Sequence, residues 1–310
     1  MREWNTGVHY PSLASICAQR VTEGERGFLM STLACGCYLG MLVVGVAGSL
    51  MLDLASIIVQ ILSPIKHTVW AYICFECTGP VFSFDSLWIS NSCVSESQPA
   101  ASRTHWLNLL IEPCVWAMVI AHLCFSSTYY TLMSWLPTFF KETFPHAKDW
   151  VFNMIPWFVA MPSSLFGGCI SDHLIKHGFG IAAVRKMMQF FAMGVASVFI
   201  FFLCKMSNFI QAVACVSVAV GLSAFNNSGV STDVHDLAPS CAEVLFGVMN
   251  TCAAFSGGLC TCISGYMIEI TGSWVTVFSL LALVNVIGVA IFIVLSDAKR
   301  VDQLNEPQII

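Results

Sequence analysis

Long uninterrupted runs of apolar residues dominate the chain, and they predict helices that cross a membrane. Six runs contain no Lys, Arg, Asp or Glu: residues 27–52, 151–171, 187–204, 208–232, 244–267 and 274–296. A seventh run, 113–140, is interrupted only by His122, and its length suits a tilted or kinked helix that ends near Pro137. Crossing the hydrocarbon core takes roughly 20 residues, and lipid permits only helices there. The pattern therefore predicts an all-α membrane protein.

The first third of the chain departs from this pattern. Residues 7–19 form only a half-length span, and between residues 53 and 105 the apolar runs are too short or are interrupted by charge. One re-entrant or broken helix could form there. Residues 90–105 are rich in Ser and Pro, as is typical of a polar linker.

We therefore predict a partial N-terminal helical half, a cytosolic linker, a C-terminal half of six transmembrane helices and a cytosolic tail. Their bounds are 1–89, 90–105, 106–298 and 299–310.

Composition and charge fit lipid rather than water as the main solvent. Only 10% of the residues are charged and 57% are hydrophobic, whereas a soluble domain carries about a quarter charged residues. The net charge of −5 makes nucleic acid an unexpected partner. Basic residues gather in alternate loops, and the excess predicts a cytosolic C-terminus. The residues on that side are Arg20, Arg26, Arg103, Lys176, Arg185, Lys186, Lys299 and Arg300.

The 15 cysteines do not form a recognisable metal or disulfide pattern. Cys35 and Cys37, like Cys260 and Cys262, lie inside apolar runs. The pair Cys74-x-x-Cys77 is not accompanied by a second Cys pair or a His pair at zinc-site spacing. We interpret the cysteines as small side chains compatible with lipid and expect neither a metal nor a cofactor.

One stretch gathers charge at the end of an apolar run. It reads GGCISDHLIKHGFGIAAVRK over residues 167–186 and brings Asp172, Arg185 and Lys186 together around glycines. A carboxylate at the end of a membrane helix is costly unless a cation or a helix N-terminus lies within reach. Arg185 and Lys186 can supply the cation.

This stretch resembles the loop signature of the major facilitator superfamily. The segments SWLPTFFKETFPHAKDW, VRKMMQ and DLAPSCAEVLFGVMNT (134–150, 184–189 and 236–251) are similar to its anion:cation symporter, or solute carrier 17-like, family. The likeness is strongest to the branch that carries nucleotides into vesicles. It implies a complete C-terminal six-helix bundle and a partial N-terminal half. Helices one to three of the family pattern have no counterpart, which an incomplete gene model, an alternative transcript or a real truncation would each explain.

The resemblance also gives the charged stretch a role. In facilitator folds such a loop braces against the other half, which here offers Glu25 and Arg26 in the segment GERGF. We hypothesise a cytosolic gate in which Asp172, Arg185 and Lys186 join Glu25 and Arg26 when that side is closed. The alternative is that these are ordinary helix-end charges that fix topology.

Two groups of polar residues lie at membrane depth and are candidate substrate ligands. His122, Ser126 and Tyr129 follow i, i+4, i+7 spacing, so one helix face would carry them into a cavity. The second group is Asn226, Asn227 and Ser228. A satisfied interior histidine and a packed helix break are equally good readings of the two groups.

Function follows from the resemblance. It implies a secondary transporter that moves organic anions, foremost nucleotides such as ATP, by alternating access. The membrane would be that of secretory vesicles or lysosomes, and chloride and protons are candidate further partners. The alternative is a truncated, non-transporting product that associates with a full-length transporter. An intramembrane hydrolase fits poorly, because Ser126 beside His122 has no acidic or metal partner. We therefore expect no enzymatic activity.

Overall fold

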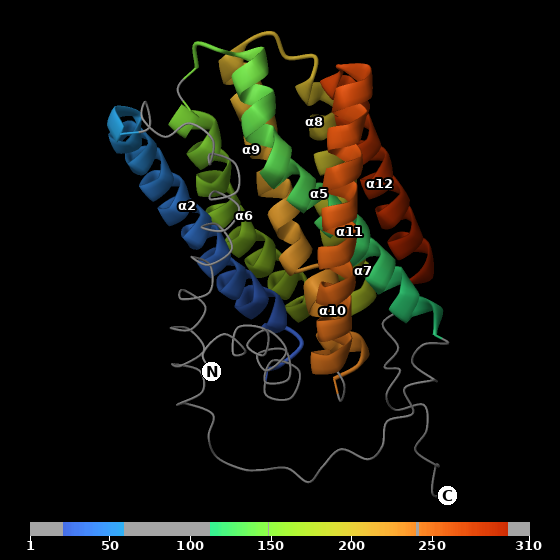
Figure 1. The fold of residues 1–310 in the computed structure, drawn as a ribbon. Helices are drawn as coiled ribbons and strands as arrows, with labels where there is room; N and C mark the ends of the chain where they lie inside the picture. The colour runs from blue at the N-terminus through green and yellow to red at the C-terminus, as the bar shows by residue number, and fades with distance from the viewer. Residues whose placement is uncertain (1–20, 59–111, 148, 240–241, 297–310) are drawn as a thin grey trace, which may run out of the picture.

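The computed structural model describes residues 21–58, 112–147, 149–239 and 242–296, and every regular element in these ranges is a helix. Figure 1 shows the helices side by side in one bundle, with α2 (Arg26–Ile58) at one edge. The long helices that follow are α5 (Pro113–Thr143), α6 (Asp149–Lys176), α9 (Phe209–Ser223), α11 (Ala242–Thr271) and α12 (Trp274–Leu295). Shorter segments are α7 (Ile181–Gln189), α8 (Ala196–Leu203) and α10 (Val230–Leu237).

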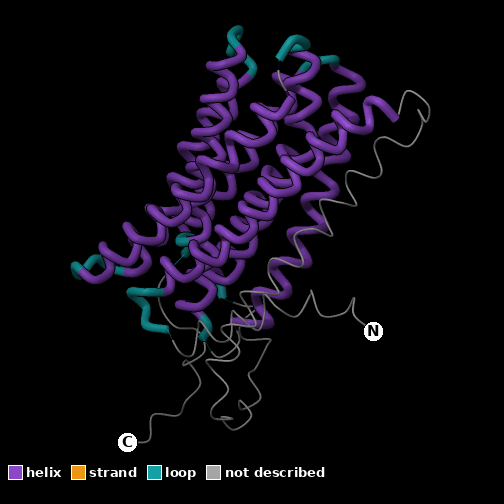
Figure 2. Tube along the Cα trace, turned by 90° about the vertical axis from the view of Figure 1, so that its left-hand side faces the viewer, coloured by secondary structure: helices purple, strands orange, loops and turns teal. Residues whose placement is uncertain are grey.

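The predicted C-terminal bundle of transmembrane helices is confirmed. In the described part of the chain, six segments are long and apolar enough to cross a membrane. They are Pro113–Thr143, Val151–Lys176, Ile181–Leu203, Phe209–Leu237, Leu245–Thr271 and Trp274–Leu295. Figure 2 shows the same helices from the side, with their axes roughly aligned along the bundle. The half-length span 7–19 and residues 59–105 lie outside the described residues.

Two predicted helix ends were wrong. Helix α5 continues through Pro137 to Thr143, and α2 extends beyond residue 52 to Ile58. A proline removes one backbone donor and normally kinks or ends a helix. Membrane helices tolerate this loss because neighbouring groups satisfy the carbonyl that is left over.

Two spans contain an irregular turn. A π-helix, Phe190–Val195, joins α7 to α8, and a 3₁₀ turn, Ala224–Asn227, joins α9 to α10. The amide of Gln189 bridges the second break: its Nε2 donates to Asn226 Oδ1 at 3.0 Å, and its Oε1 accepts from the backbone N–H of Val230 at 3.3 Å. A Cβ at Gly229 would lie 2.6 Å from Gln189 Oε1. Glycine therefore leaves room for the side chain that satisfies the broken backbone.

Helices α2 and α6 cross at unusually close range, and two glycines permit it. A Cβ on Gly168 would lie 2.8 Å from both the carbonyl oxygen of Gly27 and the Cα of Phe28. A Cβ on Gly27 would lie 2.5 Å from Asp172 Oδ1. Small residues let helix backbones approach in membranes. This crossing brings the end of α6 onto the first turn of α2.

The crossing gives a first prediction. Substituting Gly168→Val should destabilise the protein by about 1–3 kcal/mol, because the added carbons meet backbone atoms of α2 that cannot move aside. The measurement is the free energy of unfolding of the detergent-solubilised protein. Gly258→Ala is the matched control, since a Cβ there meets nothing within 4 Å. Equal stability of the two variants would contradict the close crossing.

Candidate functional site: a buried charge network

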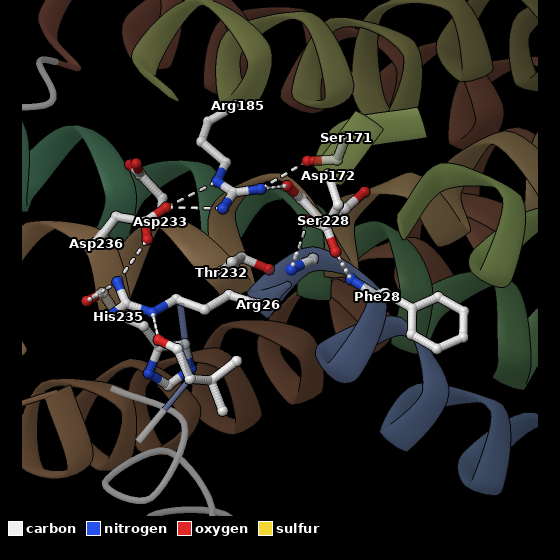
Figure 3. Close-up of polar contacts among 12 residues, drawn as sticks. Arg26, Phe28, Ser171, Asp172, Arg185, Ser228, Thr232, Asp233, His235 and Asp236 are labelled. Carbon is white, nitrogen blue, oxygen red and sulfur yellow. Dashed lines mark hydrogen bonds and ion pairs between the residues drawn. The ribbon is translucent and has the colours of Figure 1, made fainter. Parts of the chain in front are cut away.

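Charged side chains from four helices meet at one end of the bundle. Figure 3 shows Arg26 from the start of α2, Asp172 near the end of α6, Arg185 from α7 and Asp236 from α10. All four are buried, and Arg185 is 0% exposed. The bundle end is the one at which α7 and α10 are labelled in Figure 1.

Asp236 binds both arginines. Its Oδ1 accepts a hydrogen bond from Arg26 Nη1 at 2.8 Å, and its Oδ2 accepts one from Arg185 Nε, also at 2.8 Å. Arg185 Nη2 lies 2.8 Å from the same Oδ2. Charge-assisted bonds of this kind are the strong ones, and a buried ion needs them to offset its lost hydration. One carboxylate therefore joins α2 to α7 and α10.

Both guanidinium groups also donate to neutral oxygens. Arg185 Nη1 donates to Ser171 Oγ at 2.6 Å and to the carbonyl oxygen of Ser228 at 3.0 Å. Arg26 Nη1 donates to the carbonyl oxygen of His235 at 3.0 Å, and Arg26 Nε donates to that of Val21 at 3.1 Å. The Ser228 carbonyl is free to accept because the helix is broken at this point.

Asp172 holds α2 through backbone groups. Its Oδ1 accepts from the N–H of Gly27 at 3.0 Å, and its Oδ2 accepts from the N–H of Phe28 at 2.7 Å. These N–H groups belong to the first turn of α2, which carries unpaired donors and the positive end of the helix dipole. Of the two partners that the sequence allowed for this carboxylate, the structure has the helix N-terminus, while Arg185 binds Asp236 instead.

The other two residues predicted for the gate lie at its edge. Glu25 Oε1 is 4.0 Å from Lys176 Nζ, and both side chains are more than half exposed. Lys186 is half-buried on α7, next to Arg185. An exposed pair at this distance contributes little to stability.

Sequence reasoning missed Asp236 and its neighbour Asp233. Both are buried, at 5% and 2% exposure, and they stand one helical turn apart on α10. The predicted run 208–232 stopped just before them because each run was taken to end at a charged residue. The signal was present in the spacing, since two acids three residues apart at the end of an apolar run share one helix face.

The structure separates the residues predicted to bind substrate. His122 Nε2 lies 3.4 Å from Asn250 Oδ1 on α11, whereas the ring of Tyr129 meets Trp157 on α6 edge to face. Ser126 is buried on the same helix as both. The shared face predicted for these three thus contacts two different helices.

The three residues predicted at the helix break, Asn226, Asn227 and Ser228, also have different partners. Asn226 binds Gln189, and Ser228 belongs to the charge network through its carbonyl. Asn227 Nδ2 donates to Tyr38 Oη at 3.1 Å and to Ser164 Oγ at 3.2 Å. Asn227 therefore links α2 and α6 at the level of the 3₁₀ turn.

Aromatic rings surround a small cavity beside this link. Phe125 stacks on Tyr129, and Tyr38 stacks on Trp157, with centroid distances of 6.3 Å in each pair. Phe125, Tyr129 and Trp157 line a cavity of about 30 Å³, together with Thr128 and Asn285. This volume holds about one water molecule. In the described ranges, no group of three or more metal-ligating side chains could hold a metal ion.

The described helices form a membrane-type bundle with interrupted helices, a feature that many membrane carriers share, and buried ion pairs lie at one end of it. Residues 4–261 match the Major Facilitator Superfamily, and the chain belongs to it. The chain is 41% identical to the voltage-gated purine nucleotide uniporter SLC17A9 of Mus musculus, and the match covers 96% of this chain and 66% of the relative. For the human protein of that name, identity is 40% and the coverages are 96% and 68%.

More distant relatives are also named as transporters. Probable anion transporter 1, chloroplastic, of Oryza sativa subsp. japonica is 28% identical over 95% of this chain and 57% of its own length. The chain spans about two thirds of the length of the SLC17A9 relatives. Relatives that are transporters rather than enzymes support the expectation that the chain is not an enzyme.

The network gives a second prediction, an order of stabilities. Asp236→Asn should cost about 3–5 kcal/mol, because it leaves two buried guanidinium groups without their shared anion. Arg26→Met should cost less, since Asp236 then keeps Arg185. The exposed variants Glu25→Gln and Lys176→Gln should stay within about 0.5 kcal/mol of the native protein. The free energy of unfolding in detergent measures all four, and a different order would contradict the assignment of Asp236 as the central anion.

Proposed function

We propose that this protein carries organic anions, foremost purine nucleotides such as ATP, across a vesicle or lysosome membrane by alternating access. The network of Arg26, Asp172, Arg185 and Asp236 holds its cytosolic side closed. The observation that carries the proposal is the position of Asp236, whose two oxygens bind arginines from α2 and from α7. Because α2 belongs to the N-terminal half in the predicted arrangement, this carboxylate joins the two halves that must separate when the gate opens.

The gate opens by exchanging these contacts for water. Separation of α2 from the C-terminal helices breaks the bond from Arg26 to Asp236 and the bonds from the first turn of α2 to Asp172. Both carboxylates become hydrated at the same moment, so the lost contacts are partly replaced. The Arg185–Asp236 bond lies within the C-terminal half and can persist in both states.

Nucleotide as substrate is supported by the relatives and by the aromatic residues at the helix break. A base needs flat surfaces and neutral hydrogen-bonding groups, which Tyr129, Trp157 and Asn227 offer. His122 and Ser126 remain candidates for polar contact on the same helix. The cavity of about 30 Å³ is far smaller than a nucleotide, so binding requires the halves to move apart.

Transport is tested by reconstitution, which gives the third prediction. Proteoliposomes should accumulate labelled ATP when a membrane potential is imposed, with chloride varied in parallel. The mouse and human relatives are named voltage-gated uniporters, which supports a potential rather than a cation gradient as the driving force. Asp236→Asn should lower uptake at least tenfold. A folded, monodisperse protein without ATP uptake would refute transport by this chain and leave its association with a longer transporter as the alternative, read by co-purification.

The base contact gives the fourth prediction. Trp157→Leu should weaken ATP binding by about 1–3 kcal/mol, the usual contribution of one aromatic ring stacked on a base. Binding of pyrophosphate, which has no base, should not change. Trp116→Leu is the matched control, because Trp116 lies on α5 with 48% of its surface exposed. Equal losses for ATP and pyrophosphate would mean that Trp157 stabilises the fold rather than contacts the base.

A further inference from the structure

Asp233 is a buried carboxylate that the network does not neutralise. It lies one turn before Asp236 on α10 and is 2% exposed. In the described part of the chain its one hydrogen-bond partner is Ser296 Oγ, at 3.5 Å. We propose that Asp233 is a proton-binding site: it holds a proton while the network is closed and releases it when the network opens. This regulation rests on the proposed gate.

Both arginines already bind groups other than Asp233. Arg185 uses Nε and Nη2 for Asp236 and Nη1 for Ser171 and Ser228. The two guanidinium groups carry two positive charges, and Asp172 and Asp236 carry two negative charges. Within the described ranges the network is therefore balanced without Asp233, and ionised Asp233 would add a negative charge that no direct ion pair compensates.

The other groups around Asp233 come from each element that packs against it. On α7 they are Arg185 and Lys186, which act on Asp233 over a distance without a direct ion pair among the described residues. On its own helix the neighbour is Asp236, which repels a second negative charge. Beyond α12 it meets the hydroxyl of Ser296.

Helix α5 contributes the last of these neighbours, and it adds no cation. Cys114, near the start of α5, lies within electrostatic range of both Glu112 and Asp233. Among the described residues, half-buried Lys186 is thus the one cation acting on Asp233 that Asp236 does not already bind, and it is partly hydrated. A buried carboxylate in this position takes up a proton rather than remaining charged.

The sign of the regulation follows. The closed network is stabilised by a neutral Asp233, which keeps its hydrogen bond to Ser296. Opening admits water, and hydrated Asp233 ionises. Low pH therefore favours the closed state, and rising pH favours opening, by at most about tenfold per pH unit for a single proton. The proton returns to the side from which it came, so it regulates the gate without driving transport.

Difference infrared spectroscopy tests directly whether Asp233 holds a proton, and it does not depend on transport activity. At neutral pH the detergent-solubilised protein should show the carbonyl stretch of a protonated carboxylic acid, and Asp233→Asn should remove it. Glu269→Gln is the matched control, because Glu269 is exposed to solvent on α11. Absence of the band in the native protein, or its survival in Asp233→Asn, overturns the proposal. Asn has the shape of the neutral acid, so failure of this variant to fold would overturn it as well.

A pH series of ATP uptake tests the coupling to the gate and is the fifth prediction. The pH is kept equal on both sides of the proteoliposome membrane, so that no proton gradient contributes. Uptake by the native protein should rise several-fold from mildly acidic to mildly alkaline pH, while Asp233→Asn should give a flat profile. A pH rise that persists in the variant overturns the coupling. If neither protein takes up ATP, the proposed function fails, while the infrared result still decides whether Asp233 holds a proton.

Discussion

The structure depends on the neutralisation of charge in a place that water does not reach. Asp236 shares its two oxygens between two arginines that come from different parts of the chain, and each guanidinium group also donates to backbone or hydroxyl oxygens. None of these charges would be tolerated singly at such burial, because the cost of dehydrating one ion is several kcal/mol. The helices that carry the charges are thus held in one register by electrostatics, where apolar packing against lipid would leave them free to slide.

Glycines and helix breaks make this arrangement sterically feasible. Gly168 and Gly27 allow α6 and α2 to cross closely enough for a side-chain carboxylate to reach backbone donors. The 3₁₀ turn before α10 frees the carbonyl of Ser228 for Arg185, and Gln189 satisfies the polar groups that the break exposes. The same irregular turn places Asn227 against α2. The 3₁₀ turn therefore lies where the two predicted halves meet.

The sequence predicted the bundle well and the site only in part, for physical reasons. A span must be largely apolar to lie in lipid, so the six C-terminal helices are visible as long runs almost without charged residues. The choice of partner for Arg185 depends on which helix ends meet, and that is a tertiary property. Electrostatics narrowed the partner of Asp172 to a cation or a helix N-terminus, yet only the crossing of α2 and α6 selects between them. Asp233 and Asp236 on α10 were not predicted, because they lie just beyond the end of an uncharged run.

The way in which Asp172 binds α2 has a consequence for sequence variation. One side of the contact is a carboxylate that any substitution would change, but the other side consists of main-chain N–H groups of Gly27 and Phe28, which nearly every amino acid retains. Proline is the exception, since it has no N–H. Natural variants should therefore accumulate freely at position 28, apart from proline, while position 172 stays constrained. A search for co-evolving residue pairs would then overlook one of the strongest links in the protein.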